Sequence, residues 1–73
     1  MADSILQAVQ DLTGWSDADL GKLIDKSRPT VQCYRTGALR EYLDGRQCQN
    51  LRAAVRLWRD QVIQGVEELE LLL

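Results

Sequence analysis

The stretch Asp17–Gly37 constrains the fold more than any other part of the sequence, because it contains the start and end signals of two helices. Ser16 is suited to cap the first helix, since its hydroxyl can accept a hydrogen bond from a free amide of the first turn. Asp25 tolerates the left-handed backbone that a tight turn requires. Gly37 is suited to end the second helix. The stretch therefore predicts two short helices joined by a tight turn.

The second of these helices is expected to begin at Ser27 or Arg28. Pro29 is allowed in its first turn, where a backbone amide has no helical partner to lose. The residues that face inward from the two helices are expected to be Leu20, Leu23, Ile24, Val31 and Tyr34. Gly21 lies in the middle of the first helix, where glycine costs about 1 kcal/mol relative to alanine. We therefore expect another helix to pass close to Gly21.

Another helix is predicted before this stretch, over about Ser4–Leu12. Ser4 and Gln7 have the spacing of a capping box, in which each side chain binds a backbone amide of the first turn. The apolar residues with helical spacing are Ile5, Leu6, Val9 and Leu12. Gly14 is expected to end the helix in a left-handed conformation.

The sequence after Gly37 predicts one or two helical turns over Leu39–Asp44, a stop at Gly45 and a polar loop over residues 46–49. Asn50 is then the expected N-cap of a long last helix, over about residues 50–72. Its apolar stripe consists of Leu51, Val55, Trp58, Val62, Val66 and Leu69. Twenty helical residues span roughly 30 Å, which is longer than the core of so small a domain can cover.

The apolar surface of this last helix predicts an interface with a second copy of the chain, since surplus apolar surface usually marks a partner site. Four apolar residues lie outside the stripe: Leu57, Ile63, Leu71 and Leu72. The expected interface residues are Leu57, Trp58, Ile63, Val66, Leu69, Leu71 and Leu72.

These elements predict a single all-α domain over residues 1–73, a small bundle of four to five helices with a long C-terminal helix. A core in a chain of 73 residues is marginal without a disulfide, a metal or a partner subunit. Cys33 and Cys48 do not form a CxxC pair, and without histidine they cannot complete a tetrahedral zinc site. We expect no metal or cofactor, and we expect reduced thiols.

Neither catalysis nor membrane insertion is predicted. The sequence has no histidine, no glycine-rich phosphate loop, and no serine or cysteine with a plausible base. Residues 1–12 lack the basic and apolar regions of a signal peptide, and no apolar run approaches the length of a membrane span. We expect a soluble, cytoplasmic protein that is not an enzyme and has no membrane partner.

The charges are distributed unevenly along the chain, although the net charge is only −2. Residues 1–21 contain four acids and no base, and residues 60–73 also contain four acids and no base. All nine bases lie in residues 22–59, together with three acids. Such a basic middle region favours an anionic partner, although an ordinary mixed-charge surface is the alternative.

The stretch Asp17–Gly37 resembles the helix-turn-helix of the phage Cro and repressor family, which is also called the xenobiotic-response-element type. The matching positions are Leu20, Gly21, Ile24, Ser27, Thr30, Val31, Tyr34 and Gly37, with the turn at residues 25–27. The turn departs from the family, which usually has glycine and an aliphatic residue where this chain has Asp25 and Lys26. A second register, ending at Gly45, would place Pro29 inside a helix, where proline costs about 3 kcal/mol.

The resemblance implies that the second helix of the stretch lies in the major groove of double-stranded DNA. The residues at the base-facing positions of the family are Arg28, Pro29, Gln32 and Cys33. Arg28 is suited to guanine and Gln32 to adenine. The residues that would contact phosphates are Lys26, Ser27, Thr30 and Arg35.

Two functions remain open at this point. The first is a small DNA-binding transcriptional regulator of phage or mobile-element type, such as a repressor, which acts as a homodimer through the last helix. The second is a phage-type antagonist that binds a host regulatory protein through protein–protein contacts and retains the helix-turn-helix only as a scaffold. Pro29 and Cys33 on the reading face favour the second. Three arginines of the last helix either extend the phosphate-binding surface, or are simply solvated or paired with acids of a neighbouring subunit: Arg52, Arg56 and Arg59.

Overall fold

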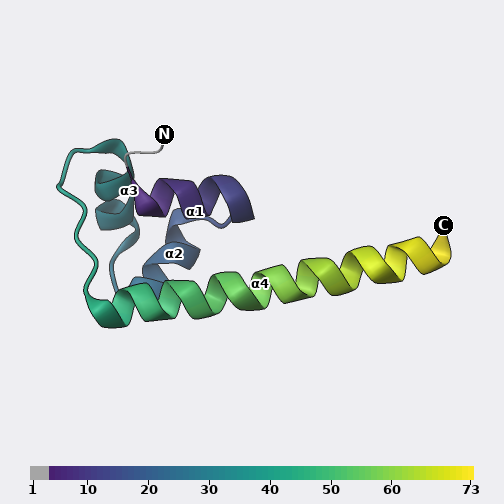
Figure 1. Ribbon diagram of the computed structural model, residues 1–73. Helices are drawn as coiled ribbons and strands as arrows, with labels where there is room; N and C mark the ends of the chain where they lie inside the picture. The colour runs from purple at the N-terminus through teal and green to yellow at the C-terminus, as the bar shows by residue number, and fades with distance from the viewer. Residues whose placement is uncertain (1–3) are drawn as a thin grey trace.

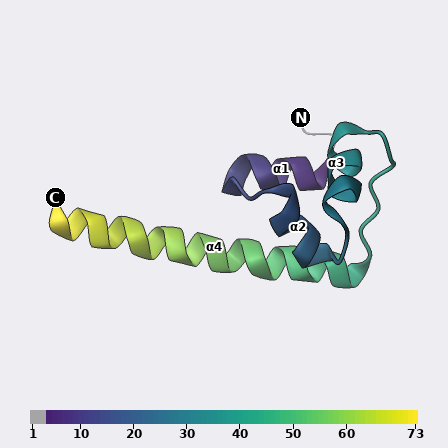
Figure 2. The ribbon, with the colours of Figure 1, turned by 180° about the vertical axis from the view of Figure 1, so that it is seen from behind.

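The computed structural model describes residues 4–73 and contains four helices, with no strand in this range. Their bounds are Ile5–Thr13 for α1, Asp17–Ile24 for α2, Arg28–Thr36 for α3 and Gly45–Leu72 for α4. The three short helices gather at the beginning of α4, and the rest of α4 extends away from them as a single rod (Figures 1 and 2). The described chain is therefore elongated, with extents of 46 × 22 × 22 Å. The predicted all-α class and the long last helix are confirmed.

The predicted helix ends before Gly37 are largely confirmed. Ser16 and Asp19 form a reciprocal capping box, with both hydrogen bonds at 3.1 Å. Gly14 and Gly37 adopt the left-handed conformation, with φ of 75° and 85°. The capping box of α1 is only half formed. The Ser4 hydroxyl accepts from the amide of Gln7 at 3.1 Å, but the Gln7 side chain binds residues elsewhere.

Glu41, which lies in the connection between α3 and α4, caps the N-terminus of α1. Its carboxylate accepts hydrogen bonds from the backbone amides of Ile5 at 2.8 Å and Leu6 at 3.2 Å, and from the hydroxyl of Ser4. These amides have no partner inside α1, and a carboxylate suits the positive end of a helix. Glu41 therefore ties the connection between α3 and α4 to α1.

The helical turns predicted over Leu39–Asp44 are absent. This segment is an irregular connection that runs from the end of α3 to the beginning of α4 (Figure 1). Leu39 and Tyr42 are exposed, and of the apolar pattern that favoured a helix Leu43 packs on the core. The contacts of Glu41 with α1 fix the segment in its extended course.

The last helix begins five residues before the predicted position. Asp44, and not Asn50, is its N-cap: Asp44 accepts from the amide of Gln47, and the Gln47 side chain accepts from the amide of Asp44, both at 2.8 Å. Gly45 therefore opens α4 instead of stopping a helix, and residues 46–49 are helical. Asn50 has another role, since its side chain donates to the carbonyl oxygen of Leu23 at 3.2 Å.

The core is small and lies where the short helices meet the beginning of α4. Its buried residues come from all four helices: Leu6, Leu20, Ile24, Val31 and Leu51. Partly buried residues pack around them: Val9, Trp15, Leu23, Tyr34 and Leu43. The expected inward face of α2 and α3 is therefore confirmed.

The turn between α2 and α3 explains the glycine in α2. Asp25 has φ of 56°, as the left-handed turn requires, and the amide of Lys26 donates to the carbonyl of Gly21 at 2.9 Å. A Cβ atom at Gly21 would overlap the carbonyl oxygen of Lys26. The expected close contact is present, but the neighbour is the backbone of the turn and not another helix.

Candidate nucleic-acid interface

The exposed polar residues of α3 gather at its beginning, next to the turn. Lys26, Arg28, Pro29 and Gln32 are all exposed. Arg28 and Gln32 are four residues apart and so lie on one side of the helix. Val31, on another side, is fully buried. The core therefore holds α3 by one face and leaves the polar face free to contact a partner.

The hydroxyl groups at the beginning of α3 are held in place by local hydrogen bonds. Ser27 caps the helix by accepting from the amide of Thr30 at 3.4 Å, and the two hydroxyls lie 2.9 Å apart in a hydrogen bond. Ser27 is exposed and Thr30 is half-buried. Cys33 is half-buried as well, so it contributes less to the exposed face than its position in the sequence suggested.

Arg35, which the sequence predicted to contact phosphates, is instead bound within the chain. Its guanidinium donates to both carboxylate oxygens of Asp17, at 2.6 and 2.7 Å, and to the side-chain oxygen of Gln7 at 2.9 Å. The side chains of Arg35 and Asp17 are only 18% and 16% exposed. The ion pair between them joins the end of α3 to the beginning of α2, which gives Arg35 an intramolecular role.

Two of the three acids near this face form bonds within the chain. Hydrogen bonds from Arg35 hold the pKa of Asp17 below its usual range, and the positive charge of Arg28 contributes to the same effect. The pKa of Asp19 is also lowered, first by the hydrogen bond from the backbone amide of Ser16. The third acid, Asp25, is exposed at the turn.

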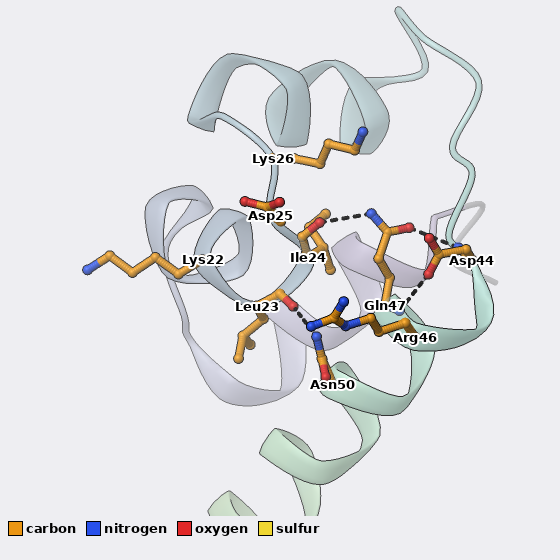
Figure 3. A pocket seen from close by; sticks show the side chains of 9 residues that line it. All are labelled: Lys22, Leu23, Ile24, Asp25, Lys26, Asp44, Arg46, Gln47 and Asn50. Atoms are coloured by element: carbon orange, nitrogen blue, oxygen red, sulfur yellow. Dashed lines mark hydrogen bonds between the residues drawn. The ribbon is translucent and has the colours of Figure 1, made fainter.

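A polar hollow lies beside this face, between the end of α2 and the beginning of α4 (Figure 3). The Gln47 side chain donates to the carbonyl of Ile24 at 2.8 Å, and Asn50 donates to the carbonyl of Leu23. These bonds satisfy carbonyl groups at the end of α2 and fix α4 to it. The basic residues that line the hollow are Lys22, Lys26 and Arg46.

Sequence reasoning missed Arg46 because it placed this residue in a loop. The signal that could have found it is the capping box of Asp44 and Gln47, which starts α4 at Gly45 and carries Arg46 in the first turn. The structure thus brings Arg46 and Lys26 to one hollow beside the turn. Arg35 is bound to Asp17 and is not available at this face.

The residues expected at a dimer interface lie along the part of α4 that leaves the core. Trp58 is half-buried. The others are exposed: Leu57, Ile63, Val66, Leu69, Leu71 and Leu72. Figures 1 and 2 show no other helix beside this part of α4.

Within residues 4–73, no group of three or more histidine, cysteine, aspartate or glutamate side chains is placed to hold a metal ion. Cys33 and Cys48 are free thiols. None of the helices described here is both long enough and apolar enough to cross a membrane.

Comparison of the chain with protein-family models, with curated proteins and with solved structures finds no match. Function therefore has to be inferred from the residues and their arrangement.

Proposed function

We propose that this chain is a small DNA-binding transcriptional regulator of phage or mobile-element type, in which α2 and α3 form a helix-turn-helix and two copies act as a homodimer. The observation that carries the proposal is the exposed polar beginning of α3. Arg28 and Gln32 are exposed at the beginning of a helix that the fully buried Val31 anchors in the core.

The chemistry of these side chains suits the major groove. Arginine can donate two hydrogen bonds to guanine, and glutamine can bind adenine in a bidentate way. Lys26 lies in the turn before α3, and Arg46 lines the same hollow from α4. Positive charges there would contact phosphates and set the register on the duplex. The ion pair of Arg35 with Asp17 keeps α3 fixed on α2, so the polar face is presented on a rigid base.

The acidic side chains near this face would repel DNA phosphates less than their number suggests. The charge of Asp17 is balanced by Arg35, and Asp19 is bound in the capping box of α2. Asp25 remains exposed beside the approach to α3. The net charge around the turn is therefore positive, because three basic residues, Lys26, Arg28 and Arg46, lie near two acids, Asp25 and Asp44.

A fluorescence-anisotropy titration with double-stranded genomic fragments tests the proposal. We expect binding that weakens steeply with salt, since displaced counterions drive contacts with phosphates. Arg28→Ala and Gln32→Ala should each cost about 1–3 kcal/mol on the best fragment. Gln64→Ala, an exposed change on α4, should leave affinity unchanged. The absence of any bound fragment at low salt, or affinity that does not respond to salt, would contradict the proposal.

A second candidate is an antagonist that binds a host regulatory protein. The observation that favours it is the row of exposed apolar side chains on α4, combined with a net charge of −2 and with Pro29 on the exposed face of α3. A pull-down from host lysate with and without nuclease distinguishes the two functions. A stoichiometric protein partner with no retained DNA would favour the antagonist, whereas DNA retained only without nuclease would favour the regulator.

A further inference from the structure

One apolar row runs along α4 from the core into solvent. We call it the α4 row, and it consists of Leu51, Ala54, Val55, Trp58, Val62, Gly65, Val66, Leu69 and Leu72. Residues at spacings of three and four lie on one side of a helix. Leu51 is buried in the core and the next three members are half-buried, whereas Val62, Val66, Leu69 and Leu72 are 44%, 48%, 56% and 82% exposed. The same face that binds the core thus continues beyond it without a partner.

The charges of α4 are separated along its length. Residues 45–59 contain four arginines and no acid, whereas residues 60–72 contain four acids and no base. A second α4 in parallel orientation would place like charges side by side. An antiparallel second copy would place the basic half of each helix beside the acidic half of the other, and such complementarity fixes orientation and register.

Gly65 is a second indication of a close neighbour. It lies in the middle of α4, where glycine costs about 1 kcal/mol relative to alanine. Nothing lies within 4 Å of the position that a Cβ atom would occupy. Gly21 is explained by the turn, but no contact within the chain explains Gly65. A glycine in an apolar row lets a second backbone approach closely.

We propose that two copies of the chain pair through α4 in antiparallel orientation, with the two-fold axis between Ile63 and Gln64. The pairing rests on the homodimer of the proposed function and adds its orientation and register. Three pairs of row residues then meet: Val62 with Gly65 of the partner subunit, Trp58 with Leu69 of the partner subunit, and Val55 with Leu72 of the partner subunit.

The same register also brings together complementary residues on either side of the row. Arg56, Arg59 and Glu70 project from one side of it, so Glu70 of the partner subunit lies beside both arginines. The end of the partner's α4 reaches the apolar groove between α1 and α4. This groove is lined by Ile5, Val9, Cys48, Leu51, Arg52 and Val55. Ile5 is 56% exposed at its edge, and the leucines of the partner's last turn would cover it.

Spin-label distances test the orientation directly. Leu72→Cys and Gln61→Cys are each labelled in a background with Cys33→Ser and Cys48→Ser, at tens of micromolar protein. The antiparallel pair places the two labels at position 72 about 25 Å apart along the axis, because seventeen helical residues separate position 72 from position 55. Labels at position 61, which flanks the row, lie only about 8 Å apart along the axis, because five helical residues separate position 61 from the facing position 66, and they broaden each other's spectra. Close labels at both positions mean a parallel pair, and absence of coupling at both means a monomer; either result overturns the proposal.

A charge reversal gives an independent readout. Arg59→Glu should raise the dimer dissociation constant about tenfold, because symmetry repeats the lost pair and places like charges together. Adding Glu70→Arg should restore the affinity, which a parallel pair would not show. Sedimentation equilibrium measures both. These results do not depend on DNA: an antiparallel dimer that binds no fragment contradicts only the regulator, and a parallel dimer that binds DNA contradicts only the orientation.

Discussion

The ion pair of Asp17 with Arg35 connects residues eighteen positions apart. It has two short hydrogen bonds and a third from Arg35 to Gln7 of α1. Three helices thus share one guanidinium, at the edge of a core that has five buried apolar residues within residues 4–73. In so small a core we expect a partly buried polar cluster to make a measurable contribution to stability.

Asp17→Asn should lower the free energy of unfolding at pH 7 by about 1 kcal/mol, since the charge-assisted bonds of the carboxylate are lost. The pKa of Asp17 is lowered in the folded chain, so its contribution is present above the unfolded pKa and disappears as pH falls through the folded value. Urea titrations should therefore show a difference between wild type and variant that shrinks towards pH 2. Asp60→Asn, at an exposed pair, serves as the control. An undiminished difference at pH 2 would refute the assignment.

Gly21→Ala should destabilise the fold by about 2 kcal/mol, because the new methyl group overlaps the carbonyl of Lys26 and the turn has to shift. Thermal unfolding followed by circular dichroism measures the loss. Gly45→Ala is the matched control, since nothing lies near its Cβ position, and it should leave the midpoint nearly unchanged. Equal effects of the two substitutions would show that helix propensity, and not the close contact, determines the outcome.

At the scale of the helices, the boundaries set by local signals were predictable and those set by distant contacts were not. Ser16, Asp25 and Gly37 act on amides or backbone angles within a few residues, so the sequence nearby contains the whole signal. The connection after α3 depends on Glu41 binding α1, thirty-six residues from Ile5. No periodicity in the connection itself reveals that contact. The beginning of α4 was misplaced because Gly45 was interpreted as a stop, although the spacing of Asp44 and Gln47 already fits a capping box.

Glu41→Gln tests the contact between the connection and α1. The amide side chain has one acceptor oxygen and no charge, so the free amides of α1 lose part of their capping, at a cost of about 1 kcal/mol. Hydrogen exchange at the amides of Ile5 and Leu6 should become several-fold faster. Glu67→Gln on exposed α4 should not change these rates. Unchanged exchange in the Glu41 variant would mean that α1 is held by its apolar contacts alone.

At the scale of the whole molecule, the candidate interface was predictable in part. The exposure of Arg28 and Gln32 follows from the one-sided apolar pattern of α3. The withdrawal of Arg35 depends on a carboxylate in another helix, and the arrival of Arg46 depends on where α4 begins. Neither can be inferred from α3 alone, because each depends on how separate helices are placed relative to one another.

Removing residues 60–73 should leave the fold intact, because every buried residue and every residue packed on the core precedes them. The shortened chain should retain the thermal midpoint of the full chain measured at dilution, and it should sediment as a monomer at concentrations where the full chain is a dimer. Loss of cooperative unfolding in the shortened chain would show that the end of α4 also supports the domain.

The length of α4 has a geometric consequence in the antiparallel pair. The two domains do not touch, so α4 acts as a ruler between them. About eighteen residues separate Gly45 from the proposed axis, which sets the two Gly45 residues roughly 55 Å apart at 1.5 Å per residue. Inserting seven residues between Trp58 and the axis adds nearly two full turns, so the domains keep their rotational phase while moving about 21 Å further apart. An insertion of two residues would instead rotate each domain by about 200° around the axis of α4. The number of residues in α4 would then determine the distance between the two sites that a dimer can bind at once.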